Sequence, residues 1–129
     1  MKLKAAKNKR VEVPNDPDFG YINIKNLSLE EVARIDSKYF KISDGGVSME
    51  NYANRDGDFA KACLTGWGNL FDESGRELKF TPKNIEKASA FVIDVGEEEG
   101  MVRFYSWVNS EREKFAEEVE AGEQEAEKN

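Results

Sequence analysis

Apolar positions near the start of the chain predict a β-hairpin. They recur at every second residue within residues 9–13 and again within residues 21–25, which is the period of a strand with one buried face. Proline, asparagine, aspartate and glycine dominate the segment between them, and these residues favour turns. We therefore expect two antiparallel strands whose aliphatic side chains face one core. Those side chains are Val11, Val13, Ile22 and Ile24.

A helical period follows this hairpin. Ser28 precedes an apolar-periodic run and Glu31 stands three residues further on, which is the pattern of a capping box. We expect a helix over residues 29–40, ended by a glycine-containing turn. The polar residues 47–57 indicate a long loop or an irregular short helix. Residues 58–64 fit either a helical turn or a strand, and we favour the strand.

Residues 63–84 predict a second hairpin followed by a helix. An alternating strand carries Trp67 as its largest apolar side chain, and residues 72–75 have the composition of a turn. Leu78 and Phe80 lie two residues apart, as on a returning strand. Trp67 and Phe80 should therefore pack together across the hairpin. A core position is the simplest role for such a tryptophan.

Two further helices are expected after this hairpin. Thr81 can accept a hydrogen bond from the first helical turn, and Pro82 suits the first helical position, so a helix should span residues 82–94. A longer helix should begin near Met101, after a glutamate cluster that favours a helix N-terminus. The apolar stripe of this C-terminal helix consists of Met101, Phe104, Tyr105, Val108, Phe115 and Val119.

The C-terminal helix also supplies the predicted partner-binding residues. Trp107 lies off the apolar stripe, and Phe115 and Val119 lie beyond Arg112, which interrupts it. We expect these three apolar side chains to be exposed among acidic neighbours and to bind an amphipathic helix of a partner. The alternative is that all three pack internally or in a dimer. Weak self-association through this helix is also expected.

The predicted fold is a small single α+β domain with two short β-hairpins and about three α-helices. The domain should span residues 11–120. A basic, flexible N-terminus is expected over residues 1–10. The glutamate-rich end of the last helix should fray near Gly122 and leave a disordered acidic tail over residues 121–129.

Composition narrows the classes of function. The chain of 129 residues has a net charge of −7, no histidine and one cysteine, Cys63. Without histidine, the common Ser-His-Asp and Cys-His nucleophile pairs cannot form, so we predict no enzyme, metal site or cofactor, with a carboxylate enzyme as a distant alternative. Net negative charge argues against nucleic acid and anionic membranes as partners. The lone cysteine and the lack of a long apolar run fit the cytoplasm.

One stretch of the chain resembles a known family. The pattern W-x-x-L-F-D-x-x-G-x-x-L-x-F-T-P-x-N runs from Trp67 to Asn84 and is similar to the motif of bacteriophage tail assembly chaperones. Lys79 and Lys83 stand where that family often has a proline and an acidic residue. With the flanking hairpin, capped helix and acidic C-terminus, the resemblance covers roughly residues 11–120. The motif residues are Trp67, Leu70, Asp72, Gly75, Leu78, Phe80, Thr81, Pro82 and Asn84.

The resemblance implies a non-enzymatic role in the cytoplasm of a bacterial host. Proteins of that family bind the tape measure protein, keep this long, helix-prone chain soluble, and help to recruit tail tube protein. A structural tail or head–tail connector subunit is one alternative. A generic cytoplasmic protein-interaction domain is another. The motif consists of packing and turn residues, so it points to a binding protein and not to a reaction.

Overall fold

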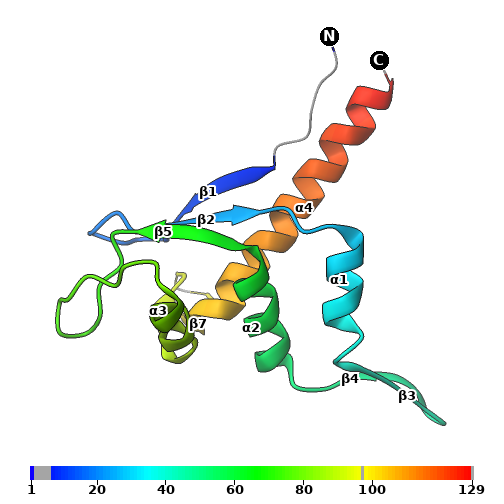
Figure 1. The fold of residues 1–129 in the computed structure, drawn as a ribbon, viewed down its shortest axis with the longest axis horizontal. Coiled ribbons are helices and arrows are strands. Elements are labelled where there is room, and N and C mark those ends of the chain that lie inside the picture. Colours follow the sequence, from blue (N-terminus) through cyan, green and yellow to red (C-terminus); the bar gives the residue numbers. More distant parts are fainter. Residues whose placement is uncertain (2–6, 97, 129) are drawn as a thin grey trace.

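A computed structural model describes residues 1, 7–96 and 98–128 of the chain (Figure 1). In chain order its elements are β1 (Asn8–Glu12), β2 (Tyr21–Lys25), α1 (Leu29–Asp36), β3 (Phe40–Ser43), β4 (Gly46–Met49), α2 (Tyr52–Cys63), β5 (Leu64–Gly68), α3 (Pro82–Lys87), the 3₁₀ turn η1 (Ala88–Ala90), β6 (Val92–Asp94), β7 (Met101–Arg103) and α4 (Phe104–Lys128). The described residues form a small α+β domain, as predicted, but with seven strands and four α-helices. None of these helices is long and apolar enough to cross a membrane.

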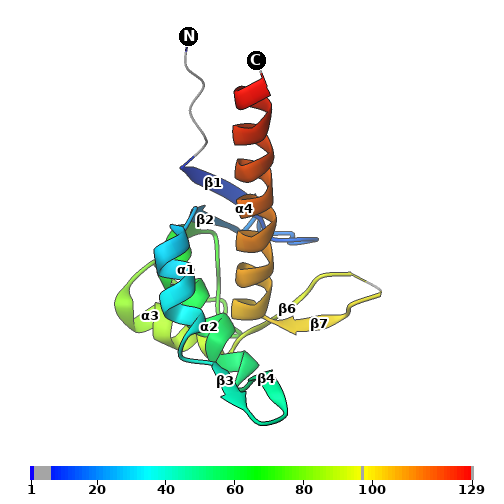
Figure 2. The ribbon, with the colours of Figure 1, turned by 90° about the vertical axis from the view of Figure 1, so that its right-hand side faces the viewer.

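The central sheet is antiparallel, in the order β1-β2-β5, and the long helix α4 passes across it (Figures 1 and 2). The predicted N-terminal hairpin is confirmed, with Val11 paired opposite Ile22. Ile22 and Ile24 are fully buried, while Val11 and Val13 are partly buried against the same core. The predicted flexible N-terminus is wrong from Asn8 onward, where β1 begins, and residues 2–6 lie outside the described residues.

Strand β5 contains an irregularity that the alternating pattern did not predict. Trp67 lies opposite Ile22 and Leu64 lies opposite Ile24, so three steps on β5 match two on β2. Because a bulge of this kind inserts one extra residue, side chains three positions apart can point to the same face of the sheet. Leu64 and Trp67 both enter the core, while Thr65, expected on the face of Trp67, is exposed.

Helix α1 is capped as predicted but ends early. The Ser28 hydroxyl accepts from the Glu31 N–H at 3.1 Å, and the Glu31 carboxylate accepts from the Ser28 N–H. The helix stops at Asp36, and the expected helical residues up to 40 lead instead into a ribbon of β3 and β4. Apolar residues at every second position favour this ribbon, and Gly46 takes φ +113° beside its turn.

Helix α2, Tyr52–Cys63, occupies most of the segment for which a loop and a strand were favoured. Phe59, Ala60 and Cys63 are buried on the side of α2 that packs against α4. Gly57 lies where an added Cβ would contact the Tyr105 ring at 3.6 Å. The alternative of a short helix within residues 47–57 is confirmed from Tyr52 onward, while residues 47–49 belong to β4. The strand favoured over residues 58–64 is wrong as far as Cys63, because packing against α4 outweighs the weak helix propensity of glycine and asparagine.

Helix α3 begins as predicted, but it ends early and the chain after it differs from the prediction. Thr81 and Pro82 begin the helix as predicted, and the Thr81 hydroxyl accepts from the Asn84 N–H at 3.2 Å. The helix ends at Lys87 and not near residue 94, because the chain continues through η1 into the β6–β7 hairpin. Met101 belongs to β7 and is exposed, so it is not part of the predicted helical stripe.

Helix α4 begins at Phe104 and is helical as far as Lys128. The predicted fraying at Gly122 and disordered tail are therefore wrong for residues 121–128, and residue 129 lies outside the described residues. Trp107, Phe115 and Val119 are 6%, 2% and 8% exposed, so the expectation that they form an exposed surface is wrong. They belong to the hydrophobic core, as the alternative of internal packing required.

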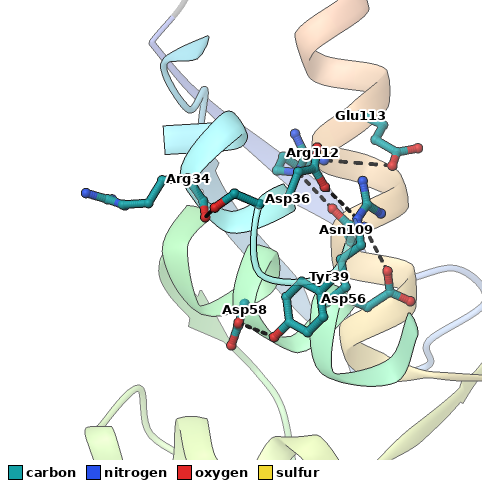
Figure 3. Close-up of polar contacts among 10 residues, drawn as sticks. Arg34, Asp36, Tyr39, Asp56, Asp58, Asn109, Arg112 and Glu113 are labelled. Carbon is teal, nitrogen blue, oxygen red and sulfur yellow. Dashed lines mark hydrogen bonds and ion pairs between the residues drawn. The ribbon is translucent and has the colours of Figure 1, made fainter. Parts of the chain in front are cut away.

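A buried polar cluster explains why the core extends past Arg112. The Arg112 guanidinium lies 4.0 Å from the Phe59 ring centroid and donates to Asn109 Oδ1 at 2.8 Å. Asn109 in turn donates to Asp56 of α2 at 2.9 Å (Figure 3). Arg112 is 5% exposed, and burial lowers the pKa of its guanidinium. The residue that seemed to interrupt the apolar stripe thus joins α4 to α2 and lets the stripe continue to Phe115.

Candidate peptide-binding groove

An open groove of about 410 Å³ lies beside the end of the central sheet. Residues 13–18 of the β1–β2 loop, residues 69–73 after β5, and residues 88–94 of η1 and β6 form its walls. The β1–β2 loop and the loop after β5 project on the same side of the molecule, at the left of Figure 1. Three segments distant in sequence therefore enclose one surface, which we call the groove.

The floor of the groove is built on Trp67. Its indole N–H donates to the Leu78 carbonyl at 2.7 Å, so the polar edge of the ring has a partner although the residue is only 8% exposed. The ring packs edge-on against Phe80 at 4.9 Å and against Phe104 at 6.0 Å between centroids. The predicted packing of Trp67 against Phe80 is confirmed. Trp67, Leu78 and Phe104 all line the groove.

The motif residues hold one wall in place without forming the predicted returning strand. Beyond β5 the pairing is reduced to a bridge between Phe71 and Glu77. Two backbone hydrogen bonds flank it, from the Leu78 N–H to the Leu70 carbonyl and from the Asp72 N–H to the Arg76 carbonyl. The side chain of Asn84 fastens the far end of the loop by donating to the Lys79 carbonyl at 2.8 Å. The wall is therefore an ordered loop, and it leaves Phe71 44% exposed at the groove.

The turn of this wall depends on one carboxylate. Asp72 Oδ1 accepts from the backbone N–H groups of Ser74 and Arg76 at 3.0 and 2.9 Å, and from the Ser74 hydroxyl at 2.7 Å. These hydrogen bonds, that of the Ser74 side chain first, lower the pKa of Asp72 below its ordinary value. Gly75 takes φ +83°, as the turn prediction requires. Asp72 is consequently ionised at neutral pH.

Acidic residues from all three walls form the rim. Asp16 accepts from the N–H groups of Asp18 and Gly20 at 3.0 and 2.8 Å, and Asp94 accepts from the Gly96 N–H at 3.0 Å. Each of these carboxylates is thus fixed by its own loop. The acidic residues that line the groove are Asp16, Asp18, Asp72, Glu73 and Asp94. Within the described residues, no lysine or arginine lines it.

The groove combines an apolar lining with an acidic rim. Its floor and walls offer Trp67, Leu70, Phe71, Phe91 and Phe104 to apolar side chains, and its rim offers fixed negative charge. A segment with a few apolar side chains flanked by lysine or arginine is complementary to both features. Among the residues that the structure describes, no group of three or more acidic, histidine or cysteine side chains is placed to hold a metal ion.

The sequence located this site only in part. Its motif supplies the floor and one wall, whereas the three residues predicted to bind a partner, Trp107, Phe115 and Val119, are buried in the core. The second wall comes from residues 13–18, whose prolines and aspartates predicted a turn without indicating what it would face. Nothing in the pattern placed residues 88–94 beside them, because this segment was expected to be helical.

Comparison of the chain with protein-family models, curated proteins and solved structures found no match. A functional assignment therefore depends on the groove and on the resemblance of the motif.

Proposed function

We propose that this chain is a non-enzymatic tail assembly chaperone of a phage or prophage, acting in the cytoplasm of its bacterial host. Its client is the tape measure protein, and its activity aids assembly of the tail tube. The groove is the observation that supports this proposal most strongly, since it joins an apolar floor to an acidic rim. The motif that resembles the chaperone family forms that floor.

The binding surface proposed here differs from the one predicted on the C-terminal helix. A helix-prone client exposes apolar side chains until it reaches its assembled state, and such side chains drive aggregation. The groove covers a few of them at a time, because its volume of about 410 Å³ is that of a small ligand pocket. A long client is therefore bound by several copies along its length.

The negative charge of the groove should favour basic segments of the client over acidic ones. The chain carries a net charge of −7, and five carboxylates surround the groove. Basic segments of the client are attracted to this rim and acidic segments are repelled. Because the rim is exposed, salt screens this attraction, which at 0.1 M ionic strength extends only about 10 Å from the charges. Capture should weaken as salt rises, while the apolar contribution persists.

Co-expression with the tape measure protein of the same phage tests the proposal. Phe71→Ser removes an exposed aromatic side chain from the groove wall without opening the core, since Phe71 is 44% exposed. Phe19→Ser is the matched control, because Phe19 is 77% exposed in the β1–β2 loop but, unlike residues 13–18 of that loop, does not line the groove. We expect Phe71→Ser to reduce the yield of soluble client and Phe19→Ser to leave it unchanged. Equal yields for Phe71→Ser and wild type would contradict the proposal.

A structural subunit of the tail or head–tail connector is the second candidate. The exposed ribbon of β3 and β4 favours it, because Ile42 is 88% exposed and Val47 is 68% exposed on that ribbon. Mass spectrometry of purified particles separates the two. A chaperone is absent from finished particles, whereas a structural subunit remains in fixed copy number.

A further inference from the structure

The hairpin of β6 and β7 presents one strand edge to the groove. It projects from the start of α4, at the right of Figure 2. Val92, Ile93 and Asp94 of β6 all line the groove. Among the residues that the structure describes, none of β7 (Met101–Arg103) lines it, so the groove lies on the β6 side of the hairpin. Within the same residues, β6 and β7 pair only with each other, which leaves the outer edge of β6 without a partner strand.

The register of the hairpin identifies the backbone groups on this edge. The Phe104 N–H donates to the Phe91 carbonyl at 2.9 Å, so these two residues form a hydrogen-bonded pair. Hydrogen-bonded and non-hydrogen-bonded pairs alternate along an antiparallel ladder. Val92 and Asp94 therefore belong to non-hydrogen-bonded pairs, and their N–H and C=O groups point away from β7. Such an edge can accept a further strand through its main chain.

The side chains of β6 show which residues an added strand should carry. Ile93 packs against the hydrophobic core, whereas Val92 and Asp94 are exposed. A strand paired with β6 places the side chain opposite Ile93 toward the floor of the groove, and its two neighbours on the face of Val92 and Asp94. An apolar side chain suits the inner position. Basic side chains suit the outer positions, because their stems cover Val92 and their charges approach the acidic rim.

We propose that the groove binds an extended segment in which basic and apolar residues alternate, and that this segment pairs with the outer edge of β6. This binding mode depends on the proposed chaperone function and adds which segments of the client are taken. Charge identifies the occupant, because five carboxylates line the groove and no lysine or arginine of the described residues does. An acidic segment, or a second copy of a chain with net charge −7, is disfavoured there. The bound segment cannot form its own helix while its backbone is paired with β6.

Synthetic peptides test the pairing on the full chain by titration calorimetry. The probe alternates lysine and valine over about six residues, and its control has the same composition in two blocks. The blocked peptide should bind at least about threefold more weakly. Two further peptides carry backbone N-methyl groups either on every lysine or on every valine, and each set removes the donors of one peptide edge. Because only one edge faces β6, their affinities should differ at least about tenfold.

Two proline variants test the same edge on the protein. Val92→Pro removes an outward N–H of β6, and the preceding Phe91, at φ −90° and ψ 150°, already has the extended backbone that proline requires before it. Arg103→Pro removes the outward N–H at the paired position of β7, and its lost positive charge does not disfavour a basic probe. Val92→Pro should weaken binding of the alternating probe at least about fivefold, and Arg103→Pro less than about twofold.

Amide hydrogen exchange on the wild-type chain gives an independent readout. The N–H groups of Val92 and Asp94 should exchange more slowly when the alternating probe is bound, and those of Met101 and Arg103 should be unchanged. No binding of the probe, equal affinities of the two N-methylated peptides, or unchanged exchange at Val92 and Asp94 would each overturn the β6 pairing. The chaperone proposal is tested separately by the yield of soluble client with Phe71→Ser, so it can stand when the β6 pairing fails.

Discussion

Replacing Trp67 tests whether the motif is the structural centre of the groove. The indole is 8% exposed, packs edge-on against Phe80, and donates to Leu78 at 2.7 Å. Trp67→Ala should cost about 3–5 kcal/mol of unfolding free energy, since it removes a large buried ring and leaves a cavity. Trp67→Phe keeps most of the packing but leaves the Leu78 carbonyl without its donor, which should cost about 1–3 kcal/mol.

The assay is urea unfolding followed by far-ultraviolet circular dichroism. Far-ultraviolet circular dichroism is suitable because it reports the backbone, whereas fluorescence would mix Trp67 with Trp107. In thermal unfolding the same changes should lower the midpoint by about 4 °C for each kcal/mol. Phe71→Ala is the control, because this exposed ring of the same loop should cost less than about 1 kcal/mol. If Trp67→Ala is no more destabilised than Phe71→Ala, the indole does not hold the groove together.

Two further predictions concern the buried Arg112 cluster and the pH dependence of stability. Arg112→Ala should lower the free energy of unfolding, measured in urea, by about 3 kcal/mol. It removes the cation stacked on Phe59 and leaves the Asn109 side-chain oxygen without its donor. An unchanged urea midpoint would show that the buried cluster does not stabilise the packing of α4. Burial raises the pKa of the Cys63 thiol to about 12 from 9.0, and the hydrogen bond to Asp58 raises the pKa of Tyr39 to about 12 from 10.0. Because the pKa of each group is higher in the folded than in the unfolded state, the folded protein holds these protons more tightly. This contribution to the free energy of unfolding is complete below pH 9 and should be lost as the pH rises toward 12. Cys63→Ala should lose less unfolding free energy than wild type as the pH first rises above 9. Equal pH profiles of stability for Cys63→Ala and wild type would contradict the role of the buried thiol.

The sequence predicted those elements whose ends are set by capping or turn residues close by in the chain. Ser28 and Glu31 begin α1, and Thr81 and Pro82 begin α3, because a cap satisfies backbone groups within one turn. The β1–β2 hairpin was predicted for a similar reason, since its alternation and its turn lie within about 20 residues of each other. These features need no knowledge of what the rest of the chain does.

The features that depend on distant partners were not predictable in the same way. Helix α2 forms because Phe59 and Cys63 pack against α4, more than 40 residues further along the chain. Trp107 is buried because α4 has neighbours on more than one side, which the width of its apolar stripe did not indicate. The groove likewise exists only after three separate loops come together. Its motif was readable in the sequence, but the opposing acidic walls were not.

Site-specific photo-crosslinking in the co-expressed complex tests the groove most directly. A benzophenone side chain is placed at Phe71 on the groove wall or at Phe40 on the ribbon, two phenylalanines with matched exposures of 44% and 41%. If the groove captures the tape measure protein, the probe at position 71 forms an adduct with it and the probe at position 40 does not. An adduct from position 40 with none from position 71 would contradict the groove as the chaperone surface.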